Sequence, residues 1–124
     1  MTPAARVQAF IEILGMLEEN RAQPGEQVVN DYLRRRRYIG SKDRRAVTAL
    51  TYDILRHRAR IGWWLVRAGG VPAEARQQVL AYLLCSAGES PESLRGLFDG
   101  ARYAPPPLTS EEAALVERLA GPDL

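Results

Sequence analysis

Residues 38–65 read YIGSKDRRAVTALTYDILRHRARIGWWL, and this stretch says more about the fold than any other part of the chain. At about 100° per residue, four of its apolar side chains fall on one side of a helix. They are Val47, Leu50, Ile54 and Ile61. The pattern predicts one long helix from Lys42 toward Ala68, capped by Ser41 and bent at Gly62. An amphipathic helix of this kind favours an all-α fold.

The opposite side of this predicted helix is basic. Arg45, Tyr52 and Arg56 point away from the apolar side, and Arg60 lies at their flank. Residues 34–60 hold ten Lys and Arg residues but only two acidic ones, a net charge of +8 within 27 residues. The rest of the chain carries −6, so the overall charge of +2 conceals an uneven distribution. Such a concentration of positive charge is typical of a surface that binds a phosphate backbone.

The other helices are predicted from caps, chain breakers and apolar spacing. They begin, in chain order, at Thr2 with Pro3, after Pro24, at Pro72, at Ser90 with Pro91, and at a capping box of Thr109 with Glu112. No stretch alternates apolar and polar residues as a strand does. The sequence therefore predicts an all-α bundle of about six helices.

Length and composition indicate one globular domain. The chain has 124 residues, of which 46% are hydrophobic and 26% charged, so one hydrophobic core is expected. No apolar run reaches the length of a membrane span, and the N-terminal residues do not resemble a secretory signal. We therefore expect a cytoplasmic protein with no membrane partner. Because Cys85 is the only cysteine and His57 the only histidine, we expect neither a disulfide nor a metal site.

Nine basic residues are the candidates for contact with nucleic acid. They are Arg34, Arg35, Arg36, Arg37, Lys42, Arg44, Arg45, Arg56 and Arg60. Guanidinium groups bind phosphate through two hydrogen bonds and stack on bases, and Tyr38 and Tyr52 are secondary candidates for stacking. Two other interpretations stay open: the charges are simply solvated, or they pair with the acidic remainder of the chain.

Two further patterns concern neighbouring residues. Trp63 and Trp64 are adjacent in a helix and cannot both face the core, so one of them is expected at the surface. The paired carboxylates at 18–19 and 111–112 lie at helix ends, and we expect them to be solvated rather than catalytic.

The segment 38–65 resembles the signature of NusB-like helical domains, in particular those at the N-terminus of the Sun/RsmB family of ribosomal RNA cytosine-5 methyltransferases. The matching features are an Asp-Arg pair that opens a helix, a tyrosine, and a Leu-Arg pair. Here they are Asp43 with Arg44, Tyr52, and Leu55 with Arg56. The opening PAARVQAFIEIL, with Arg6, also resembles the first helix of that family. One departure is Asp53, which stands where the family commonly has glycine.

The resemblance implies an RNA-binding helical domain in residues 1–100, and in residues 101–124 a linker and short helix leading toward a catalytic domain that this chain does not contain. That domain would use S-adenosylmethionine, so the chain itself is expected to hold no cofactor and to catalyse no reaction alone. Its expected partners are ribosomal RNA and the intramolecular catalytic domain. An alternative is a free-standing NusB-like transcription antitermination factor that binds RNA together with a protein. A third possibility is a docking module for an acidic protein.

Overall fold

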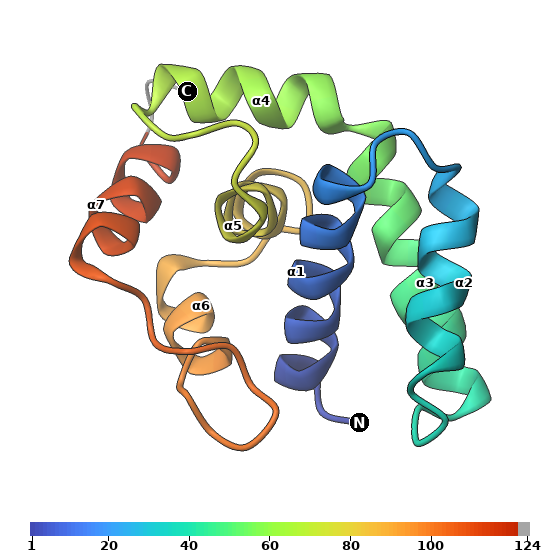
Figure 1. The fold of residues 1–124 in the computed structure, drawn as a ribbon. Helices are drawn as coiled ribbons and strands as arrows, with labels where there is room; N and C mark the ends of the chain where they lie inside the picture. Colours follow the sequence, from blue (N-terminus) through green and yellow to red (C-terminus); the bar gives the residue numbers. More distant parts are fainter. Residues whose placement is uncertain (122–124) are drawn as a thin grey trace.

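Seven helices, and no strand, make up residues 1–121, the part of the chain that the computed structural model describes (Figure 1). They are α1 (Pro3–Glu19), α2 (Gly25–Arg34), α3 (Ser41–Arg56), α4 (Arg58–Arg67), α5 (Ala75–Cys85), α6 (Pro91–Leu97) and α7 (Ser110–Leu119). The predicted all-α class is confirmed. The number of helices exceeds the predicted six by one, because one predicted helix is in fact two.

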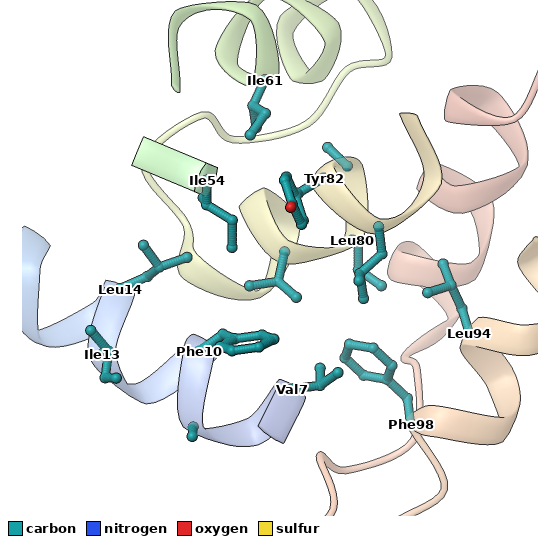
Figure 2. Packing of buried hydrophobic residues seen from close by; sticks show 14 of the residues in the cluster. Val7, Phe10, Ile13, Leu14, Ile54, Ile61, Leu80, Tyr82, Leu94 and Phe98 are labelled. Atoms are coloured by element: carbon teal, nitrogen blue, oxygen red, sulfur yellow. The ribbon is translucent and has the colours of Figure 1, made fainter. Parts of the chain in front are cut away.

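That helix is the one expected to run from Lys42 toward Ala68. It ends at Arg56, and the chain turns at His57, whose φ and ψ are −100° and 12°. The predicted bend at Gly62 is wrong, since Gly62 lies inside α4. The turn sends α4 across the side of α5, which is seen end-on in Figure 1, instead of continuing along α3. Because of this turn, Ile61 enters the core from a different direction than Ile54 (Figure 2). The turn is favoured because it allows both side chains to be buried.

Helix starts follow the predicted caps in three places and differ in two. The side chains of Thr2, Ser90 and Thr109 each accept a backbone N–H of the first turn, as expected. The N-cap of α3 is Gly40 rather than Ser41, which is the first helical residue. The fourth predicted helix starts not at Pro72 but at Ala75, because the Glu74 carboxylate accepts the N–H groups of Arg76 and Gln77.

The core is built around α1 and α5. In Figure 1 α5 is seen end-on in the middle, between α1 on one side and α6 and α7 on the other. Six consecutive residues of α5, from Gln78 to Leu83, are buried, so this helix is enclosed on all sides, as its apolar sequence predicts. Figure 2 shows Phe10 of α1 and Phe98 pointing toward the same space beside Leu80.

The last helix belongs to the same core. Leu115, Val116 and Leu119 of α7 are buried in the hydrophobic cluster that α1 and α5 form. Glu112, expected to be solvated, is only 8% exposed. Both of its carboxylate oxygens accept hydrogen bonds from the Arg76 guanidinium, at 2.7 and 2.8 Å, which joins α7 to α5. The proposed division near residue 100 therefore does not coincide with a gap in the core.

Candidate nucleic-acid interface

Two of the nine candidate residues shape the loop between α2 and α3. Arg44 donates to the backbone oxygens of Ile39, at 2.6 Å, and of Arg36, at 3.1 Å, and so fixes the loop against the first turn of α3. The Arg36 guanidinium lies 3.7 Å above the ring of Tyr32 and donates to its backbone oxygen. Both arginines therefore have structural contacts that account for them.

Two other candidates pair with an acidic residue of their own helix. Arg34 lies 3.1 Å from the Asp31 carboxylate, and Arg56 lies 3.1 Å from that of Asp53. The arginine side chains remain 73% and 67% exposed. Exposed pairs of this kind contribute about 0 to 1 kcal/mol, so an incoming phosphate can replace them at small cost.

The remaining five candidates are exposed and have no acidic partner within ion-pair distance among residues 1–121. They are Arg35, Arg37, Lys42, Arg45 and Arg60. Three acidic residues outside 34–60 pair with other members of the basic run: Asp31 with Arg34, Glu12 with Arg36 and Glu18 with Arg58. Glu18 was expected to be solvated. Its side chain is only 16% exposed, and it is held in the ion pair with Arg58.

Helix α3 arranges part of this charge in a line. Its buried residues Val47, Thr51 and Ile54 face α1, which turns Arg45 and Arg56 to the opposite side. Arg56 is eleven positions after Arg45, so the two lie within about 20° of each other around the helix and roughly 16 Å apart along it. We call Arg35, Arg37, Lys42, Arg45, Arg56 and Arg60 the basic path.

Exposed aromatic residues accompany the basic path at both ends. Tyr38, beside Arg37 in the loop, is 73% exposed. Beyond the turn at His57, Arg60 lines a surface hollow together with Trp63 and Trp64. Trp63 is 54% exposed, whereas Trp64 packs against the core, which confirms that one of the two tryptophans lies at the surface. Exposed rings that could stack on bases thus lie at both ends of the basic path.

The sequence pattern did not predict a structural role for Asp53. The only hint was that Asp53 stands where the resembled family commonly has glycine. Its carboxylate accepts a hydrogen bond from the buried Tyr82 hydroxyl and so ties α3 to α5. That bond and the nearby Arg56 hold the pKa of Asp53 below its ordinary value. Burial and the same bond raise the pKa of Tyr82 to about 12.

Other kinds of site receive no support from residues 1–121. Within them, no group of three or more His, Cys, Asp or Glu side chains is placed to hold a metal ion. None of the described helices has the length and apolar character to cross a membrane. Cys85 is partly buried, and burial raises the pKa of its thiol.

Comparisons of the chain with protein-family models, curated proteins and solved structures found no match.

Proposed function

We propose that this chain is an RNA-binding domain that holds a single-stranded segment of RNA along the basic path. The observation that carries the proposal is the set of five exposed cations in residues 35–60 without acidic partners in the described residues, accompanied by exposed aromatic rings. Guanidinium groups bind phosphate through paired hydrogen bonds, and aromatic rings stack on unpaired bases. Exposed rings favour a single strand, because the bases of an A-form duplex are stacked inside it.

The resemblance of residues 38–65 supports a narrower form of the proposal. In that form the domain positions ribosomal RNA for an S-adenosylmethionine-dependent cytosine-5 methyltransferase domain of the same protein. No reaction is assigned to the chain itself.

A free-standing antitermination factor is the second candidate, and one observation favours it. Trp63, Val66 and Val71 are more than half exposed, which gives the region of α4 an apolar surface for a protein partner. The reading frame after Leu124 separates the two candidates. An S-adenosylmethionine-binding domain encoded there would exclude the free-standing factor.

The experiment reverses two charges of the basic path. Arg45→Glu and Arg60→Glu break no ion pair, and together they should weaken binding of a single-stranded ribosomal RNA fragment by at least tenfold at low salt. Contact with four to six phosphates gives the parent chain a log–log salt slope of about −3 to −4, and the double variant should lose about 1 to 1.5 of it. Fluorescence titration at several salt concentrations measures both.

Arg95→Glu is the matched control, because Arg95 is exposed on α6, away from the basic path. It should weaken binding less than either single reversal in the path does. Equal affinity of the parent and double variant would contradict the proposal. Retention of an acidic protein, with no detectable RNA binding, would favour the docking-module interpretation.

A further inference from the structure

A pocket of about 430 Å³ opens beside the start of α1, next to the basic path. One wall comes from the loop between α2 and α3, through Tyr38, and the other from the loop between α6 and α7, through Arg102 and Tyr103. Gln8 and Glu12 of α1 line its interior. The proposed function leaves this pocket without a role.

The mouth of the pocket carries two exposed aromatic side chains. Tyr38 is 73% exposed and Tyr103 is 63% exposed, although burial usually stabilises such rings. Tyr103 also has a φ of 67°, and it is the only described residue other than glycine with a positive φ. A tyrosine in this backbone conformation is strained, so folding alone does not favour it at this position.

Hydrogen-bond acceptors line the interior. The Glu12 carboxylate, 40% exposed, accepts the Tyr32 hydroxyl at 2.6 Å and the Gln8 amide N–H at 3.1 Å. The second of these bonds fixes which way the Gln8 amide points, and its Oε1 is a buried acceptor with no donor among residues 1–121. That oxygen is enclosed by protein atoms, so the partly exposed Glu12 carboxylate is the acceptor that a ligand N–H group can reach.

The charges around the pocket are already balanced. Asp43 pairs with Arg6 at 2.8 Å and with the terminal amino group at 3.6 Å, while Glu12 has Arg36 at 3.9 Å. Arg102 adds a further positive charge at the rim. A neutral ring therefore suits the pocket better than an ammonium ion, which these cations would repel.

We propose that the pocket takes one unpaired nucleobase with an exocyclic amino group, from the RNA strand that lies on the basic path. Tyr38 and Tyr103 contact the faces of the base, and Glu12 accepts a hydrogen bond from its amino group. Cytosine, adenine and guanine each have such a group, whereas uracil presents a carbonyl oxygen where cytosine has its amino group. This inference rests on the proposed function and adds base selection to it.

The test compares eight-nucleotide oligomers of cytidine and of uridine, two pyrimidines that differ at the exocyclic position. The parent chain should bind the cytidine oligomer about tenfold more tightly, the size expected for one hydrogen bond to a charged acceptor. Glu12→Gln replaces an acceptor by an amide that can donate, so the preference should vanish or reverse.

A second variant separates ligand contact from folding. Tyr103→Gly removes a wall of the pocket but also relieves the positive φ, so it should weaken binding of cytidine oligomers several-fold without lowering the melting temperature. Equal binding of both oligomers by the parent would overturn the base pocket. The proposed function would still stand if the Arg45→Glu, Arg60→Glu double variant bound both oligomers more weakly than the parent. Failure to bind either oligomer would overturn both. Competition by tetramethylammonium but not by cytidine monophosphate would identify a cation site and overturn the base pocket.

Discussion

The buried, charged carboxylate of Glu112 holds α7 against α5. Its burial is tolerated because the Arg76 guanidinium pairs with it. Its side chain is 10% exposed, and the Arg76 guanidinium is the main reason why its pKa lies below the ordinary 4.5. A carboxyl whose pKa is lowered by folding stabilises the folded state above its unfolded pKa. That stabilisation is lost as the pH falls through the folded pKa. Asp43 and Asp53, whose pKa values are also lowered, act in the same direction.

We therefore expect Glu112→Gln to lower the free energy of unfolding by about 1 to 3 kcal/mol at pH 7, because it weakens two charge-assisted hydrogen bonds. At pH 3 the difference from the parent should be smaller, because the stabilisation by the Glu112 charge decreases as the pH falls below the unfolded pKa of this carboxyl. Urea unfolding at the two pH values measures this. Glu117→Gln, on the exposed side of the same helix, is the control and should change stability by less than about 0.5 kcal/mol. An equal loss at both pH values would show that charge is not the cause.

At the scale of single elements, the loop between α2 and α3 depends on one side chain for its shape. Arg44 spans two backbone oxygens that a lysine ammonium, without the planar fork of a guanidinium, would not reach together. Arg44→Lys should cost about 1 kcal/mol and should speed amide exchange at Ile39, whose N–H bonds to Arg36 within the loop. Hydrogen exchange followed by NMR measures this local effect.

Arg45→Lys is the matched control for that loop. It makes the same chemical change one residue further along, at an exposed side chain with no described hydrogen bond. Exchange at Ile39 should stay at the parent rate. If both variants speed exchange equally, the effect comes from the substitution type and not from the Arg44 contacts.

Helices were predictable where caps and apolar spacing agree within one segment. Thr2, Ser90 and Thr109 act locally on the first turn that follows them, so the sequence contains the whole signal. The turn at His57 was missed because Ile54 and Ile61 lie seven residues apart, a spacing that also suits one straight helix. Only the position of α5, which is tertiary information, shows that the chain must turn to bury both.

At the scale of the whole molecule, the uneven charge was readable from composition, but the pairing of each charge was not. Arg58 and Arg60 are two residues apart in the same basic run, yet Arg58 pairs with Glu18 while Arg60 is exposed. Which acid lies nearby depends on how α1 and α4 pack, and local sequence does not contain that distance.

The position of α7 in the common core leads to a prediction about cooperativity. Leu115 is buried beside α5, so Leu115→Ala should destabilise the fold by about 2 to 5 kcal/mol. Both tryptophans of the chain, Trp63 and Trp64, lie on α4, and their fluorescence reports unfolding of a helix other than α7. If one core spans α1 to α7, the fluorescence midpoint in urea should fall with the circular dichroism midpoint. If residues 101–124 fold apart from the rest, the fluorescence midpoint should not move.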